Sequence, residues 1–265
     1  MGRQTTRTQV SLGKRVALFG CLVDAMTMDE TVRRIEDIVR SGGPIQHCAL
    51  NAAGLVAMQD DERLRQIVQR CGHVSADGQS LVWASRALRQ QVPERVAGPD
   101  LFMALIRSAA ERGWTVYLLG AEQTVLWAAR TELLRRYPDL QIVGVQNGYF
   151  DESESDRIVQ EIRGSGARML FVALPTPMKE YWIADHLEEL GVPFCMGVGG
   201  TFDIVSGHIT RAPIWMQSAG LEWVYRLFQE PKRMWRRYLV GNTRFATMFV
   251  RELLSNIGPN GNRRS

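Results

Sequence analysis

The segment best suited to catalysis or ligand binding is Asp77-Gly78, which follows a short apolar run ending at Ala76. A carboxylate and a glycine at the end of a strand lie where open α/β sheets bind ligands, beyond the carboxyl ends of the strands. Glycine lets the backbone turn sharply there and approach a ligand closely. On local sequence alone two roles are open to Asp77: it is a proton acceptor in catalysis, or it caps the helix that follows.

A second candidate segment is Gly197-Val198-Gly199-Gly200, which follows the last apolar run before residue 207. Its third glycine comes too early for the G-x-G-x-x-G pattern of dinucleotide-binding folds, and it does not open a strand–helix–strand unit. A dinucleotide oxidoreductase is therefore not favoured. A glycine-rich turn can still bring backbone N–H groups close to a phosphate or a sugar.

The composition is that of a soluble globular protein, with 45% apolar and 23% charged residues among 265. The net charge of +4 gives no reason to expect nucleic acid as a partner. No C-x-x-C spacing occurs among the 4 cysteines, so neither a zinc ribbon nor a disulfide framework is expected, and scattered thiols suit a reducing cytoplasm. The sequence also lacks an acidic D-x-D pair for a divalent metal and an apolar run long enough to span a membrane.

Apolar runs alternate with helical patterns through residues 15–208, which predicts a Rossmann-like α/β fold: a parallel sheet covered by helices on both faces. Strands are expected at 15–23, 45–50, 74–76, 114–119, 141–145, 169–174 and 194–198. A capping box of Thr27 and Glu30 starts the first helix. A single helix is expected between Asn51 and Gly72.

The pattern changes after Gly207, because residues 211–251 interleave eight basic with eight aromatic residues. Pro213 and Pro231 divide this basic aromatic helical appendage into pieces. Aromatic rings together with cations suit a membrane interface, whereas a solvated basic face with aromatics packed on the core is the alternative. The predicted organisation is a disordered tail at 1–14, an α/β catalytic core at 15–208, a membrane-associating appendage at 209–254 and a disordered tail at 255–265.

Several segments in a fixed order together resemble one known family. They are ADG at 76–78, ERVAGPDL at 94–101, YLLGA at 117–121, NGYF at 147–150, GVGGTFDIVSG at 197–207 and RAPIWMQSAGLEWVYRLFQEPKRMWRR at 211–237. The chain is similar in these segments to the WecG/TagA/CpsF glycosyltransferases, glycosyltransferase family 26. The resemblance spans roughly residues 16–240.

The resemblance implies an inverting, metal-independent transferase without a cofactor, which moves a sugar from a UDP-sugar to a polyprenyl-diphosphate-linked sugar. It implies that Asp77 is the base, that Arg95 is the arginine of the R-V-x-G segment, and that the appendage folds over the active site. Both Asp77 and Arg95 are predicted to be catalytic. The predicted substrate-binding residues are Asn51, Gly78, Gly98, Asp100, Gly120, Ala121, Asn147, Gly148, Lys179, Glu180, Gly199, Gly200, Asp203, Arg226, Arg233 and Arg236.

Two departures from the family pattern bear on specificity. The family commonly has T-x-N where this chain has Ala49-Leu50-Asn51, and it commonly has glutamine where this chain has Lys179. Lysine cannot accept a hydrogen bond, so recognition of donor or acceptor is expected to differ there. The donor sugar is expected to be a hexose or an N-acetylhexosamine, such as N-acetylmannosamine or glucose.

The predicted function is therefore hexosyl transfer in bacterial cell-surface polysaccharide biosynthesis, at the inner face of the plasma membrane. The expected partners are the UDP-sugar, an undecaprenyl-type lipid-linked acceptor and the membrane surface, with a homo-oligomer also allowed. The alternative is a non-catalytic module that binds a nucleotide sugar and is recruited to the membrane. Release of UDP in the presence of the acceptor distinguishes the two.

Overall fold

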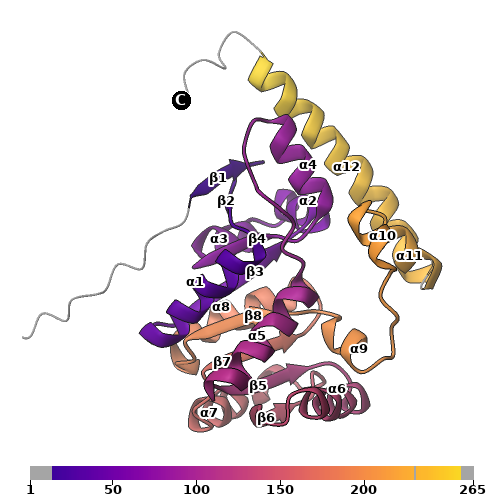
Figure 1. Cartoon of the computed structure of the whole chain (residues 1–265). Coiled ribbons are helices and arrows are strands. Elements are labelled where there is room, and N and C mark those ends of the chain that lie inside the picture. The colour runs from indigo at the N-terminus through magenta and orange to yellow at the C-terminus, as the bar shows by residue number, and fades with distance from the viewer. Residues whose placement is uncertain (1–13, 230, 258–265) are drawn as a thin grey trace, which may run out of the picture.

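The core of the molecule is a sheet of six parallel strands (Figure 1). The computed structural model describes residues 14–229 and 231–257, with the backbone alone at 232–234 and 236–240. The strands are β3 (Ile45–Leu50), β4 (His73–Ala76), β5 (Thr115–Gly120), β6 (Gln141–Gln146), β7 (Met169–Ala173) and β8 (Phe194–Gly197), in the spatial order β4-β3-β8-β7-β5-β6. The predicted Rossmann-like α/β class is confirmed.

Helices cover both faces of the sheet, because its central strands are apolar on both sides. One face packs against α1 (Met28–Ser41), α5 (Gly98–Arg112), α6 (Gln123–Arg136) and α9 (Thr201–Val205). The other face packs against α7 (Ser155–Gly164), which follows the short 3-10 helix η1 (Glu152–Glu154), and α8 (Met178–Leu190). A third apolar cluster lies at the β3–β4 end, among α2 (Ala52–Asp60), α3 (Glu62–Arg70) and α4 (Gln79–Ala87).

The expectation of one strand at 15–23 is wrong. The segment forms a hairpin of β1 (Arg15–Leu18) and β2 (Cys21–Asp24), which pair antiparallel in a small sheet of their own. Phe19 and Gly20, between the strands, have φ values of 53° and 77°. Two consecutive left-handed residues are typical of the tight turn that suits the twist of a hairpin, so the chain reverses here instead of continuing.

The first helix begins as the sequence predicts, and the second does not run as predicted. Thr27 and Glu30 form the capping box of α1, and the helix ends at Gly42 with a φ of 79°. The single helix expected before Gly72 is divided at Asp61, whose carboxylate accepts a hydrogen bond of 2.9 Å from the backbone N–H of Leu64. Asp61 therefore ends α2 and caps α3.

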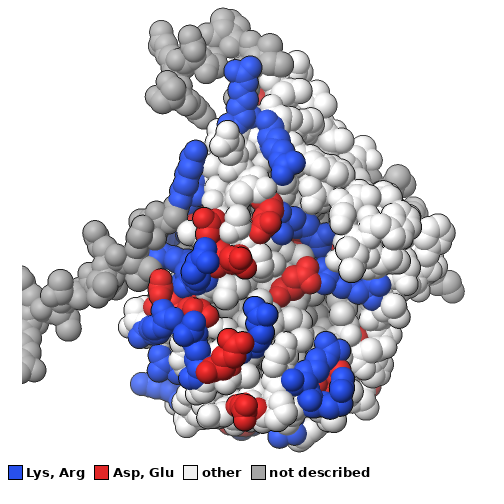
Figure 2. All heavy atoms as spheres, in the orientation of Figure 1, with Lys and Arg blue, Asp and Glu red and all other residues white. Residues whose placement is uncertain are grey.

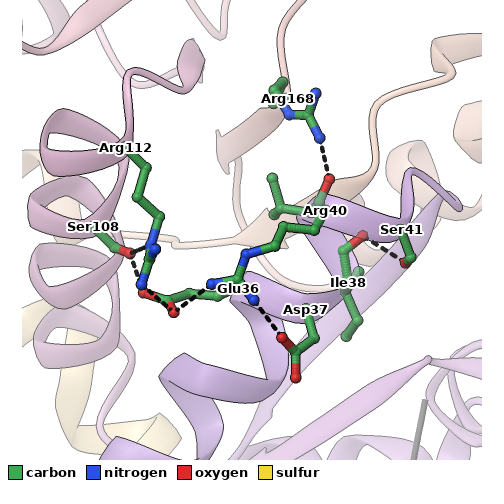
Figure 3. Close-up of polar contacts among 9 residues, drawn as sticks. Glu36, Asp37, Ile38, Arg40, Ser41, Ser108, Arg112 and Arg168 are labelled. Carbon is green, nitrogen blue, oxygen red and sulfur yellow. Dashed lines mark hydrogen bonds and ion pairs between the residues drawn. The ribbon is translucent and has the colours of Figure 1, made fainter.

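A charged network joins α1 to α5 (Figure 3). The buried carboxylate of Glu36 accepts hydrogen bonds from Ser108 and Arg112 of α5, the latter with an Nη2–Oε2 distance of 2.7 Å. Arg40 adds an ion pair of 3.3 Å from the next turn of α1. Arg168, which precedes β7, donates to the backbone carbonyl of Val39. These bonds fix α1 and α5 relative to each other on one face of the sheet.

The carboxyl-terminal segment consists of α10 (Ile214–Ser218), α11 (Glu222–Gln229) and α12 (Pro231–Ile257). Pro213 precedes α10 and Pro231 is the first residue of α12. The α12 helix, in yellow in Figure 1, contacts α2, and the Arg244 guanidinium pairs with Asp60 of α2 at 2.5 Å. None of the helices among the described residues is both long and apolar enough to cross a membrane.

Candidate active site

Many of the predicted site residues lie along one edge of the sheet, which we call the rim: the last residue of each of the six parallel strands and the two residues that follow it. Asp77 follows β4, Asn51 follows β3, Gly199 follows β8, Gly120 ends β5 and Asn147 follows β6. Because neighbouring strands lie about 4.8 Å apart, the rim is about 24 Å long from β4 to β6. A single small ligand cannot contact both ends of the rim, whereas an extended ligand can cover much of it.

Asp77 does not cap the helix that follows it. The cap residue of α4 is Gly78, and no side chain bonds to the first turn of that helix. The Asp77 Oδ1 atom instead accepts a hydrogen bond of 3.1 Å from the backbone N–H of Gly98, the first residue of α5. This is the only hydrogen bond to its carboxylate from the described residues, so Oδ2 remains available to a ligand.

Burial and neighbouring charges decide how basic Asp77 is. Burial raises the pKa of its carboxyl group, while the positive charge of Arg95 and the Gly98 N–H lower it. The negative charge of Glu222 raises this pKa again and Arg211 lowers it, and the net result is a raised pKa. Asp77 is therefore a stronger base than an ordinary aspartate.

A chain of ion pairs beside Asp77 joins the core to α11. Arg95 Nη2 lies 2.6 Å from the Glu222 carboxylate, and Arg211 Nε lies 3.3 Å from the other oxygen of Glu222. Arg211 also pairs with Asp100, with an Nη2–Oδ2 distance of 2.8 Å. Sequence analysis missed Arg211 and Glu222 as site residues, because charge content alone does not tell which charges of a helical segment face the rim.

Arg226 of α11 also reaches the rim. A Cβ atom at Gly200 would lie 3.0 Å from Arg226 Nη2 and 3.6 Å from Asp203 Oδ2, so this guanidinium passes directly over Gly200. Gly199 has a φ of 51° and open space around the position of a Cβ atom. The other two arginines predicted for the site, Arg233 and Arg236, have side chains that lie outside the described residues.

At the β5–β6 end of the rim, close packing of the backbone accounts for the glycines. Gly120 has a φ of 114°, and a Cβ atom there would lie 2.5 Å from the backbone carbonyl of Ala173. Gly148 donates to the Ala121 carbonyl at 2.8 Å, and Ala121 itself has a φ of 57°. The Asn147 amide is held nearby, donating to the side chain of Gln123 at 3.1 Å.

Asn51 lies at the rim after β3, whereas Lys179 and the buried Glu180 lie in the first turn of α8, which follows β7. Asn51 caps α2 by accepting from the Gly54 N–H at 3.0 Å, and Gly78 packs against its Cβ atom. The Lys179 ammonium group donates to Thr176 and to the carboxylate of Glu180, so its charge is already paired within the protein. The charge of Lys179 is thus turned toward its own neighbours.

A cavity of about 300 Å³ lies apart from these residues, at the turn of the hairpin. It is lined by Phe19, Gly20, Met58, Gln59, Arg65 and Gln69. The guanidinium of Arg65 is already engaged there by the Met58 carbonyl at 2.9 Å and the Glu62 carboxylate at 2.9 Å. The lining contains none of the predicted site residues, and it offers neither a base nor an unpaired cation for group transfer.

The six parallel strands with covering helices define an open α/β protein, a class whose ligands generally bind at the carboxyl ends of the strands. The chain also matches the model of the glycosyl transferase WecG/TagA/CpsF family over residues 16–258. The chain belongs to this family and is a glycosyltransferase, which confirms the resemblance found in the sequence. The match includes the whole rim and the segments α10 and α11, with most of the sequence that follows them.

Proposed function

We propose that this protein is an inverting glycosyltransferase that transfers a hexose or N-acetylhexosamine from a UDP-sugar to a polyprenyl-diphosphate-linked sugar in bacterial cell-surface polysaccharide synthesis. The observation that carries the proposal is Asp77: a half-buried carboxylate at the rim with a raised pKa and one oxygen free of hydrogen bonds from the described residues. Its position at the carboxyl end of β4 suits a group that meets substrate directly.

In the proposed reaction the acceptor hydroxyl attacks the anomeric carbon of the donor from the side opposite the diphosphate. A new C–O bond forms as the bond from the anomeric carbon to the diphosphate oxygen breaks, and UDP leaves with the bonding electrons. Asp77 takes the proton of the attacking hydroxyl as the bond forms. A single displacement inverts the configuration at the anomeric carbon.

The departing diphosphate needs cations, and arginine supplies them in a geometry that matches phosphate oxygens. Arg95 lies on the Asp77 side of the rim, and Arg226 lies over Gly200 near β8. Backbone N–H groups of the turn at Gly199 and Gly200 add donors for a phosphate or a ribose. In this proposal arginines and N–H groups carry the diphosphate, and neither metal nor cofactor takes part.

The exposed face of α10 and α11 supports adsorption to a membrane surface, and in this proposal that surface is the cytoplasmic one. Ile214, Trp215 and Phe228 are 80%, 66% and 81% exposed. Figure 2 shows that the surface at the place of these helices is largely free of charged side chains. Large apolar side chains gathered on an exposed helical segment are typical of interfacial binding, which would bring the rim to a lipid-linked acceptor.

The decisive experiment is an assay of UDP release from a panel of UDP-sugars, with and without a polyprenyl-diphosphate-linked acceptor in detergent. Acceptor-dependent release with one donor supports the proposal and identifies the sugar. Binding of a UDP-sugar without release under any acceptor condition would instead favour a non-catalytic nucleotide-sugar module.

A further inference from the structure

Ion pairs connect the segment α10–α11 to the core. No residue of either helix is buried among the described side chains. The ion-pair chain Asp100–Arg211–Glu222–Arg95 crosses from the core to the appendage and back. By contrast, α12 packs apolar side chains, including Phe245 and Phe249, on the cluster at the β3–β4 end. A segment with few buried apolar contacts is among the easiest parts of a protein to displace.

Glu222 lies between Arg211 and Arg95 in this series of ion pairs, and it accepts only one of the hydrogen bonds that the Arg95 guanidinium can donate. A single oxygen of Glu222 lies 2.6 Å from Arg95 Nη2, while Nη1 makes a long bond of 3.4 Å to the Gln217 carbonyl. The Nε–H of Arg95 is buried and donates to no acceptor among the described residues. A guanidinium binds oxyanions best through two parallel hydrogen bonds, and Arg95 does not make such a pair of bonds to Glu222.

The local charge balance also works against a diphosphate while Glu222 stays in place. Asp77, Asp100 and Glu222 carry three formal negative charges, and Arg95 and Arg211 carry two positive charges, which gives a net charge of −1 for the group. An incoming diphosphate adds further negative charge at short range. Moving the Glu222 carboxylate away from Arg95 removes that repulsion and frees the Nη2 donor beside the Nε–H, which has no acceptor among the described residues.

We propose that Glu222 is a built-in counter-anion that occupies Arg95 in the absence of donor and is displaced by the diphosphate of the UDP-sugar. This inference rests on the proposed function. On displacement Glu222 remains paired with Arg211, so α11 stays tethered to Asp100 while Arg95 turns to the phosphate oxygens. Glu222 is thus a positioning residue, which acts on the reaction through Arg95.

The test is the affinity of the full-length protein for UDP, measured by isothermal titration calorimetry. Glu222→Gln removes the competing charge and keeps the size of the side chain, so UDP should bind roughly fivefold tighter, the upper end of the range for ion pairs that solvent reaches. Glu189→Gln is the matched control, because Glu189 is exposed on α8. The control should bind UDP as the wild type does.

A second readout separates this role from a merely structural one. Glu222 raises the pKa of Asp77, so Glu222→Gln should move the acid limb of kcat/KM to lower pH. Unchanged or weaker UDP binding by Glu222→Gln, with binding by the wild type intact, overturns the inference and leaves the proposed function standing. Wild-type protein that does not bind UDP overturns both.

If Glu222→Gln does not fold, Glu222→Asp takes its place. The aspartate keeps the charge for Arg211 and is one methylene too short to hold Arg95 at the present distance. UDP should then bind to Glu222→Asp more tightly than to the wild type, but the gain should be smaller than for Glu222→Gln. Weaker binding by this variant contradicts the inference.

Discussion

At Asp77 the effects of burial and of neighbouring charge oppose each other. Burial favours the neutral acid, while Arg95 and the Gly98 N–H favour the carboxylate. The site therefore holds a carboxylate whose proton affinity depends on the ion pairs around it. One residue of this set, Glu222, comes from a segment more than a hundred residues away, so the appendage directly influences the proposed base.

Replacing Asp77 by asparagine tests the proposed base. Asn keeps the shape of the side chain and accepts the Gly98 N–H through its carbonyl oxygen, but it cannot take a proton. Turnover should fall by about 10²–10⁴-fold, the usual worth of general base catalysis. Acceptor-dependent UDP release gives the rate, and circular dichroism with a thermal melt reports whether the fold is intact. Asp139→Asn, at an exposed turn residue before β6, is the control, and near-normal turnover of Asp77→Asn would remove this residue from the mechanism.

The pH dependence of catalysis should follow the charges around Asp77. A base must be deprotonated to act, so kcat/KM should rise with pH through the pKa of Asp77, above the range of an ordinary aspartate. Arg95 lowers this pKa, hence Arg95→Gln should move the acid limb to higher pH, besides costing about 10²-fold in kcat for the lost phosphate contact. An acid limb at the same pH in wild type and Arg95→Gln would contradict this electrostatic account.

The positions of residues at strand ends could be predicted from the sequence, whereas their hydrogen-bond and ion-pair partners could not. The positions of Asp77, Asn51 and Gly199 follow from where apolar runs stop, because carboxyl ends of parallel strands share one edge. The pairing of Arg95 with Glu222 depends on how α11 returns to the rim, over 127 positions of chain. Local pattern carries no information on such a contact. It also could not show that Gly120 is required by the close approach of Ala173.

Among the helices, the junction of α1 and α5 carries the most concentrated polar network. Burial raises the pKa of Glu36, but hydrogen bonds from Ser108 and Arg112 and the charges of Arg112 and Arg40 outweigh it, so the net pKa is lowered. A carboxylate with a lowered pKa stabilises the folded state above its unfolded pKa, and this stabilisation is lost as pH falls through the folded value. The contribution of the network in Figure 3 to the stability of the α1–α5 contact is therefore lost at acid pH.

Glu36→Gln should lower the free energy of unfolding by about 2 kcal/mol near pH 7, because it removes charged hydrogen bonds from a buried position. The difference from wild type should shrink at acid pH, where wild-type Glu36 also becomes neutral. Urea unfolding at neutral and acid pH measures both effects. Glu111→Gln is the control, since that α5 side chain is 67% exposed and pairs with Arg107 only at 3.9 Å. A difference that stays constant with pH would show that the charge of Glu36 is not its source.

Elements with strong local signals were predicted closely, and those decided by a turn were not. The first helix begins at the expected capping box of Thr27 and Glu30, because both residues of the box lie within one turn of sequence. The hairpin at 15–24 was mistaken for one strand, because its turn uses Phe19, a residue that rarely takes a left-handed conformation. The break at Asp61 was missed because the helical pattern continues on both sides of it.

For the molecule as a whole, the sequence predicts the layers of the core but leaves the orientation of the appendage open. The α/β alternation fixes the sheet and its two helical faces. The α12 helix continues to Ile257, past the boundary predicted at 254, and packs Phe245 against Phe19 with ring centroids 5.4 Å apart. That contact joins two segments that lie near opposite ends of the chain, and no periodicity within either segment indicates it. The proposed boundary at 208 between core and appendage stays a prediction.

Membrane adsorption should depend on the exposed apolar side chains of α10 and α11. The triple variant Ile214→Ser, Trp215→Ser, Phe228→Ser should reduce binding to vesicles with anionic lipid by at least about tenfold, because each large apolar side chain that leaves water contributes about 1 kcal/mol or more. Cosedimentation measures the effect. The matched control replaces Trp127, Val143 and Tyr149, which are exposed on and beside α6 and β6, by serine. Equal binding of both triple variants would rule out this face as the docking surface.

The contact between Phe19 and Phe245 also has a consequence for biosynthesis. The hairpin that carries Phe19 is translated 226 residues before Phe245, its aromatic partner in α12. Until α12 has been translated, Phe19 therefore lacks the ring that packs against it, and a nascent chain that pauses before α12 exposes apolar surface there. Premature termination within α12 should consequently send the truncated product to chaperones and proteases, even though every strand of the sheet has already been made.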